Sequence, residues 1–320
     1  MTLNIRTLYA TLISLIFVST SFSQIIEKYF SYNWKETKPA DARFYSLINK
    51  TDSGWYRSDY FMATKRLQMV GLFEDSNSKS QNGYVYYYYS NGMIEQSGNC
   101  DHGKKIGLWL TYHTNGMIAD STVYANNNPS GTSLGWHDNG FMSDSSYWDD
   151  KGNGVKISWY DNGNISSAGY YSTWNQRIGK WQYFHKNGRI SSFEIYEKGT
   201  MTSKECYDEN GNILENCLPD TPAIFPGGQA AWQNYLVRQL YFPPGLEFRN
   251  ADAATVLVSF AVDEDGNIKD AFVDIPLFPQ FDAIALDVIK KSPKWKPAIQ
   301  NNRKIKSFAK QPVVFLIKYY

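Results

Sequence analysis

The sequence lacks an excess of charge of either sign. Among its 320 residues, 32 Lys and Arg face 31 Asp and Glu, so the formal net charge is +1. This balance argues against a chain that binds nucleic acid along its whole length. Three cysteines are too few for a disulfide scaffold. Twelve prolines and a mean hydropathy of −0.46 exclude collagen-like and multi-span membrane proteins.

Long hydrophobic runs are also scarce. One extends from Leu8 to Phe22, follows the basic Arg6, and ends in small residues before Gln24. A run of about 15 residues interrupted by hydroxyls is short for a spanning helix but typical of a secretory signal. We therefore expect residues 1–23 to be a cleaved signal peptide and the protein to reach the periplasm or cell envelope. If the segment is not cleaved, it anchors the protein in the inner membrane.

Aromatic residues are abundant instead, at 16% of the chain, and with 23 glycines they favour β-structure rich in turns. An Asn-Gly pair recurs from residue 91 to residue 211, every 23 to 25 residues. An aromatic residue stands four positions before each glycine, and an aliphatic residue stands two positions after it. Members of this pattern include Tyr112, Gly116, Ile118, Trp136, Gly140, Trp159, Gly163, Phe184, Gly188 and Ile190.

Asn-Gly between alternating residues predicts a β-hairpin, and the pattern also selects the turn. A two-residue turn would place the aromatic and the aliphatic residue on opposite faces. A three-residue loop with a left-handed glycine pairs them directly across the two strands. We prefer this loop, and we expect hairpins of about 24 residues to stack with the aromatic residues in their core. The same register points Cys206 and Cys217 to opposite faces, which disfavours a disulfide between them.

The segment before these hairpins is less regular. Residues 24–54 are interpreted as a lead-in, in which 40–47 suit a short helix, and 55–71 have the pattern of a degenerate capping hairpin. The aromatic-x-x-Asn-Gly-x-aliphatic run, with intervening Gly-x-Trp signatures, resembles the MORN-variant repeat that also occurs in the YwqK antitoxin-like family. The resemblance covers 55–216 and implies a scaffold architecture.

The charge changes sign where the repeats stop. Acidic residues outnumber basic ones in 81–220, whereas basic residues dominate from 222 onward, and prolines flank the switch. We place a linker at 217–224 and a second domain at 225–320. Its patterns predict, in order, a helix, two strands, a helix and a strand, at 228–240, 255–262, 268–275, 281–291 and 311–320. The expected fold class is mainly β: a stacked hairpin array followed by a small α+β domain with two helices on a three-stranded antiparallel sheet.

Several short motifs in this second domain carry a family resemblance. They are Phe225-Pro-Gly-Gly, Val256-x-Val-x-Phe-x-Val-Asp-x-x-Gly-x-Ile-x-Asp, Pro293-x-Trp-x-Pro and Pro312-Val-Val-Phe. Together they resemble the TonB C-terminal domain in the version common in Bacteroidetes-type energy transducers. The resemblance implies that the domain binds an extended peptide, the TonB box of an outer-membrane receptor, by strand addition.

Strand addition needs a sheet edge with unpaired backbone groups. The candidate edge is the last strand, with residues Val313, Val314, Phe315, Leu316 and Ile317. Its continuous apolar run suits a paired or covered core strand equally well. From Val288 to Tyr320 the chain has basic residues and no acidic one. Among them, Lys304, Lys306 and Lys310 either steer an acidic partner or belong to a solvated face.

Other chemistry is not supported by the sequence. His113, His137 and His185 share one position in the repeat, but equivalent positions in adjacent hairpins lie about 10 Å apart, too far to share a metal ion. We expect them on the solvent face and expect no metal. No catalytic triad, phosphate loop or metal-spaced cluster stands out, so we expect no enzyme activity and no cofactor.

Two departures from the family bear on function. Family transducers carry an uncleaved membrane helix and usually a proline-rich spacer, whereas this chain has a cleavable start and a hairpin array. We expect an exported envelope protein, peripheral to the membrane once cleaved, whose TonB-like domain binds an outer-membrane receptor or other envelope protein. The alternative is a structural scaffold in which the MORN-like repeats bind a protein or wall polymer and no energy is transduced. Neither interpretation involves nucleic acid.

Overall fold

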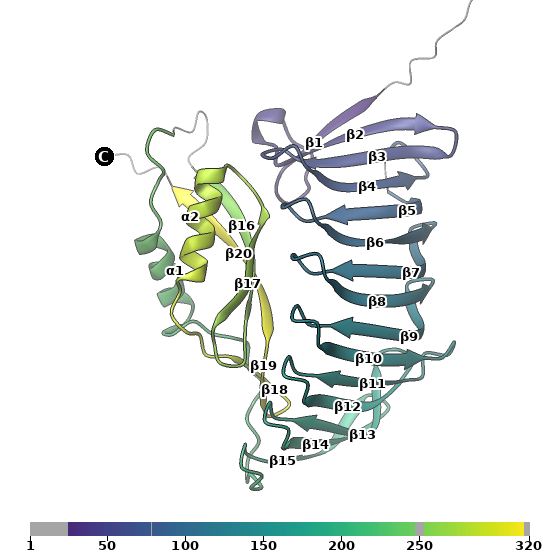
Figure 1. Ribbon diagram of the computed structural model, residues 1–320, viewed down its shortest axis with the longest axis vertical. Helices are drawn as coiled ribbons and strands as arrows, with labels where there is room; N and C mark the ends of the chain where they lie inside the picture. Colours follow the sequence, from purple (N-terminus) through teal and green to yellow (C-terminus); the bar gives the residue numbers. More distant parts are fainter. Residues whose placement is uncertain (1–24, 78, 247–252, 317–320) are drawn as a thin grey trace, which may run out of the picture.

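The computed structural model describes residues 25–77, 79–246 and 253–316, so the expected signal peptide lies outside the described residues. Fifteen antiparallel strands pair in chain order into one long sheet (Figure 1). They are β1 (Ile26–Phe30), β2 (Phe44–Thr51), β3 (Gly54–Phe61), β4 (Leu67–Phe73), β5 (Gln81–Tyr88), β6 (Ile94–Asp101), β7 (Lys104–Tyr112), β8 (Ile118–Ala125), β9 (Asn128–Trp136), β10 (Met142–Trp148), β11 (Gly154–Trp159), β12 (Ile165–Ser172), β13 (Gln176–Phe184), β14 (Ile190–Glu197) and β15 (Thr200–Cys206).

A small α+β domain stands beside this sheet (Figure 1). It consists of α1 (Gly228–Gln239), β16 (Ala253–Val262), β17 (Ile268–Ile275), α2 (Pro279–Lys290), β18 (Ala298–Gln300), β19 (Arg303–Ile305) and β20 (Ser307–Leu316). Its sheet has the order β17-β16-β20, and β18 and β19 form a separate short hairpin. The fold class predicted from the sequence is confirmed. The β18–β19 hairpin is an addition to the predicted order of elements.

The helices of this domain cover one face of its sheet. Trp232 and Leu236 of α1, with Phe281 and Ile289 of α2, pack on alternate residues of β16 such as Val256 in one core. The two helices thus leave the opposite face of the three-stranded sheet free to meet the long sheet.

The hairpin loops have the geometry that the repeat spacing predicts. Tyr112 pairs with Ile118 and Trp159 with Ile165, in each case across a bulge. The intervening Gly116 has φ of 84°, in the left-handed region that glycine tolerates. The same aromatic–aliphatic pairing recurs at all six Asn-Gly loops. The preference for a three-residue loop is therefore confirmed.

Neighbouring hairpins are joined by side-chain hydrogen bonds at these loops. Nε2 of His113 lies 2.8 Å from the backbone oxygen of Trp136 in the next hairpin, and His137 and His185 repeat the contact. Nδ2 of Asn115 donates to the backbone oxygen of Asp138, again one hairpin further on. The expectation that the histidines lie on the solvent face is wrong: they join consecutive hairpins.

The two faces of the long sheet differ. The face that carries Trp109 contains the most tightly packed side chains. The indole of Trp109, for example, lies against Gly98 of β6 so closely that a Cβ atom on Gly98 would come within 2.3 Å of the ring. Trp181 covers Gly169 in the same way. The opposite face carries Tyr112 and the other loop aromatics, which are only half-buried. From the sequence, these loop aromatics were expected to form the core of the array. The densest packing lies instead on the Trp109 face, because nothing among the described residues covers the Tyr112 face.

Two local expectations are wrong. Residues 40–47 form no α-helix: a short 3₁₀ turn, η1 (Pro39–Asp41), precedes β2, so the lead-in joins the same sheet. Cys206 and Cys217 form a disulfide. The strand register does not predict this disulfide because the chain leaves the hairpin after an isolated bridge at Ile213. Cys217 therefore no longer follows the alternation of a strand.

Candidate peptide-binding site

The small sheet has two edges, and the long sheet covers one of them, β17. Ser90, in the first Asn-Gly loop, donates a hydrogen bond to the backbone oxygen of Val273. The ring of Tyr89 meets the ring of Phe272 edge to face at 5.4 Å. The hairpin loops therefore occupy backbone acceptors that an incoming strand on β17 would need.

A half-buried arginine from the lead-in forms the upper end of this contact. Nη1 of Arg43 donates to the backbone oxygen of Thr255 at 2.6 Å, and Nη2 donates to Pro276 at 2.7 Å. Burial lowers the pKa of Arg43 to about 10, and the charge of nearby Asp282 opposes this shift. Burial in turn raises the pKa of Asp282 to about 6. Phe44 packs against Ile275 of β17 beside them.

The other edge strand is β20, which pairs with β16 alone among the described strands. Val313 and Phe315 point into the helix-covered core and are buried. Val314 and Leu316 alternate with them and are exposed. Ile317, the last residue of the predicted edge, lies outside the described residues.

Pro312 indicates which backbone groups of β20 face outward. Proline has no N–H and is accommodated in a strand where its nitrogen faces the unpaired side. Backbone groups of alternate residues point to the same side of an antiparallel strand. We therefore expect Val314 and Leu316 to present their N–H and C=O groups away from β16, beside their exposed apolar side chains. Such an edge can hydrogen-bond an extended peptide.

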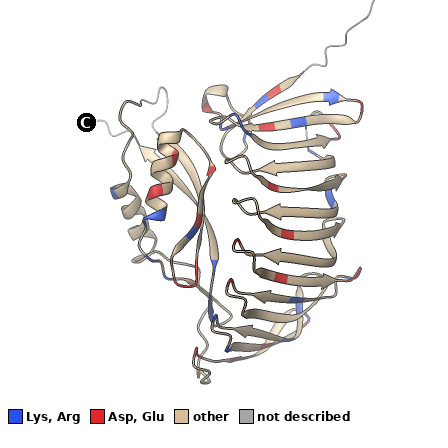
Figure 2. Ribbon diagram, viewed as in Figure 1, with Lys and Arg blue, Asp and Glu red and all other residues tan. Residues whose placement is uncertain are grey.

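The three lysines singled out for electrostatic steering are engaged within the protein. Nζ of Lys306 lies 2.6 Å from Asp270, and Nζ of Lys310 lies 2.6 Å from Asp274, both on β17. Lys304 lies 3.4 Å from Glu209 at the end of the long sheet. Figure 2 shows basic and acidic positions close together along the small sheet. Because each lysine already faces a carboxylate, the basic run offers less net field than its sequence indicates.

A cavity of about 520 Å³ lies between the hairpin loops and the helix-free face of the small sheet. Phe272 and Phe308 line its apolar part, and His113 and Glu95 line its polar part. Burial and the nearby charge of Asp274 raise the pKa of the Glu95 carboxyl. Lys310 of β20 also borders this cavity, so the space adjoins the lower part of the candidate edge.

The β18–β19 hairpin closes the lower end of the contact between the two sheets. Its turn residues, Asn301 and Asn302, both have positive φ, and their side chains lie against β14. Arg303 reaches Ser166 of β12 with Nη2 at 3.1 Å, and burial lowers its pKa. This hairpin was not predicted from the sequence, although Asn-Asn between two short β-prone runs is a recognisable turn signal.

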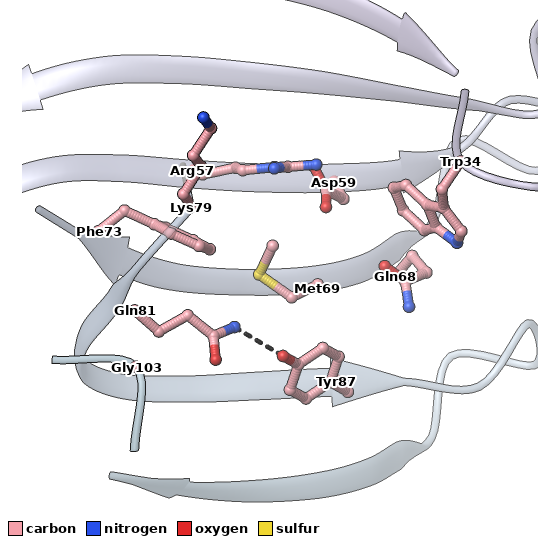
Figure 3. A pocket seen from close by; sticks show the side chains of 10 residues that line it. All are labelled: Trp34, Arg57, Asp59, Gln68, Met69, Phe73, Lys79, Gln81, Tyr87 and Gly103. Carbon is pink, nitrogen blue, oxygen red and sulfur yellow. Dashed lines mark hydrogen bonds and ion pairs between the residues drawn. The ribbon is translucent and has the colours of Figure 1, made fainter. Parts of the chain in front are cut away.

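A second cavity, of about 420 Å³, lies on the Trp109 face near the start of the long sheet (Figure 3). Arg57 lies 5.8 Å from the ring centroid of Phe73, and its Nε is 2.7 Å from the buried Asp59. Burial raises the pKa of Asp59 although Arg57 counteracts it. Gln81 donates to the Tyr87 hydroxyl at 2.6 Å across the cavity floor. These polar groups satisfy one another, and both polar and aromatic side chains line the cavity.

The architecture is that of a small α+β domain held against a long sheet of hairpins. Residues 240–317 match the family model described as Gram-negative bacterial TonB protein C-terminal. The match agrees with the resemblance of the second domain and indicates a TonB-like protein of the cell envelope, with a role in TonB-dependent transport. Domains of this family bind or transduce energy and are not enzymes. No curated protein matches the chain.

The comparisons leave the repeats without a family. The matched range lies entirely within the small domain and its approach, so the likeness of residues 55–216 to MORN-variant repeats stays a prediction. Among the described residues, no helix is long and apolar enough to cross a membrane. The described part of the chain also contains no group of three or more metal-ligating side chains.

Proposed function

We propose that this is an exported envelope protein whose TonB-like domain binds TonB-box-type peptides of outer-membrane receptors by strand addition at β20. In this proposal the linker at 217–224 joins the hairpin array to the binding domain. The array resembles MORN-variant repeats and serves as the scaffold that holds the domain. The protein acts in TonB-dependent transport.

The main support for the proposal is that one edge of the small sheet is covered and the other is open. Ser90 of a hairpin loop and Arg43 of the lead-in both bind backbone oxygens of β17, whereas β20 is unpaired on its outer side among the described strands. An added strand gains main-chain hydrogen bonds from the edge and side-chain contacts from the exposed Val314 and Leu316. The family match supports a protein partner in general.

The test uses the full chain, labelled for NMR, with peptides taken from TonB-box segments of receptors of the same organism. Binding by strand addition is expected to shift the amide signals of 311–316. Val314→Pro removes one outward N–H and is expected to weaken binding about fivefold or more, since a hydrogen bond contributes about 1 kcal/mol or more. Val314→Thr keeps the N–H and a strand-forming side chain and serves as the matched control.

Two results would count against peptide binding at β20. One is the absence of any shift in 311–316 at millimolar peptide. The other is equal binding by the Pro and Thr variants, which would place the peptide elsewhere. Shifts confined to the residues that line the cavity between the two sheets would identify that cavity as the site.

The second candidate function is a structural scaffold that transduces no energy. One observation favours it: the Tyr112 face of the long sheet exposes many large apolar side chains, which the TonB-like domain does not cover. In that case, envelope proteins or wall polymer would bind the repeats. Retention of such a partner by the Val314→Pro variant would favour this function.

A further inference from the structure

The Tyr112 face of the long sheet is apolar over many strands. Adjacent pairing partners share a face, so the register defines its members. The most exposed large side chains on it from β5 to β12, each at least 40% exposed, are Tyr84, Leu108, Ile118, Val123, Tyr147, Ile165 and Tyr170. Monomeric soluble proteins rarely expose so extended an apolar surface.

This face is also free of charge away from the strand ends. Between β5 and β12, its described inner positions carry aromatic, aliphatic, small hydroxyl or amide residues and no Asp, Glu, Lys or Arg. Figure 2 shows few charged positions on these middle strands, and Asp120 and Asp144 belong to the opposite face. A partner that relied on charge would find nothing to pair with here.

The central row of the face alternates between large and small residues. Across consecutive strands from β5 it contains Tyr86, Ser97, Leu110, Ser121, Leu134, Ser145, Ile157 and Ala168. Within this row, the first strand of each hairpin contributes the large residue and the second strand the small one. In the neighbouring row, second strands also carry large exposed residues, such as Tyr147 of β10 and Tyr170 of β12. Since strands lie about 4.8 Å apart, the large residues of the central row recur about every 10 Å.

We propose that a second copy of this chain covers the Tyr112 face, so that the protein is a face-to-face homodimer. Displaced by one strand, the large residues of the central row of one copy lie over the small residues of that row in the other, and two sheets then pack about 10 Å apart. Eight strands of about six residues span roughly 38 by 20 Å, or about 800 Å² on each copy. This equals the area that a standard stable interface buries on each partner.

The surroundings of this face leave it open to a second copy. The TonB-like domain contacts the hairpin loops through Tyr89 and Ser90. Its β18–β19 hairpin reaches Glu194, which lies on the Trp109 face. A dimer through the Tyr112 face therefore displaces no contact between the two sheets. It also leaves β20 accessible, so dimerisation and peptide binding are independent of each other.

The test measures the mass of the full chain by sedimentation equilibrium. A dimer of twice 36.7 kDa is expected at micromolar concentration. Leu108→Lys and Tyr147→Lys each place a charge in the centre of the interface, and each is expected to raise the dissociation constant at least about 100-fold. Both side chains are exposed in the monomer, so circular dichroism should show an unchanged fold. Val237→Lys, on the exposed face of α1, is the matched control.

Three outcomes would overturn the proposal. A wild-type chain that stays monomeric at about 100 µM would do so, since a standard interface normally gives tighter binding. A dimer unaffected by both lysine variants would place the interface elsewhere. Binding of a monomer to lipid vesicles or an insoluble glycan, lost in Leu108→Lys, would reassign the face to that ligand.

Discussion

Asn302 is the residue at which the contact between the TonB-like domain and the long sheet can best be tested. Its side chain is almost fully buried. Nδ2 donates to the backbone oxygens of Ser191 and Tyr207 at 3.1 and 2.9 Å, and Oδ1 accepts from the backbone N–H of Leu218 at 2.9 Å. One amide thus joins the β18–β19 turn to β14, to Tyr207 at the end of the array and to Leu218.

The cost of Asn302→Ala follows from what each partner retains. The oxygen of Ser191 still accepts from the N–H of Tyr207, and the oxygen of Tyr207 is still within reach of His185. These two losses cost about 1 kcal/mol each, whereas the N–H of Leu218 is left unpaired at about 1 to 3 kcal/mol. We expect a total destabilisation of this contact of about 3 to 5 kcal/mol.

Hydrogen exchange read by mass spectrometry reports this loss locally. Opening of the lower contact should reduce the protection of 298–305 by a factor of about 100 or more, because 1.4 kcal/mol corresponds to a factor of ten. Protection of β16 should change little. Asn212→Ala removes a hydrogen bond to Asp208 in an exposed loop and is the matched control. Protection of 298–305 within about threefold of wild type would refute the energetic reasoning.

Three further predictions concern other contacts. Gly169→Ala should destabilise the protein by about 3 kcal/mol in urea unfolding, and much less when Trp181 is replaced by Leu, because the new methyl group meets the indole. Loss of the Cys206–Cys217 disulfide, which closes a loop of 11 residues, should cost about 3 kcal/mol, measured by comparing unfolding with and without reductant. Asp282 has a folded-state pKa of about 6, above its ordinary 3.8, so its contribution favours folding below pH 3.8 and is lost as the pH rises through 6. Asp282→Asn should therefore remove that decline in a pH series of unfolding midpoints. A decline of the same size in the variant would contradict the assignment.

The repeat was predictable because its signal is local. Tyr112, Gly116 and Ile118 lie within one hairpin, so their spacing alone determines the loop and the pairing across it. The same reasoning failed at Cys217, because the chain changes direction before reaching it. Strand β2 was missed because its alternation is weak over residues that also suit a helix.

The contacts between the two sheets had no signal in the sequence. Arg43 meets Thr255, and Asn302 meets Ser191, across more than 100 intervening residues, and periodicity does not encode such pairs. The predicted edge strand is placed at an edge by its pairing with β16 alone, which only the sheet order reveals. The pairing of the lysines proposed to steer a partner was not visible in the sequence, because their carboxylate partners are distant in the chain. These partners lie on β17 and in the segment between β15 and α1.

The small domain contacts the array at two points that are separated by many hairpins. Arg43 and Phe44 hold it at β2, and the turn at Asn302 holds it at β14. An ordinary repeat protein can gain or lose a unit at little cost, since each unit touches only its neighbours. Here one additional hairpin would increase the distance between the two contacts by about 10 Å and break one of them. The distance between its two contact points on the TonB-like domain therefore determines how many hairpins the array can contain.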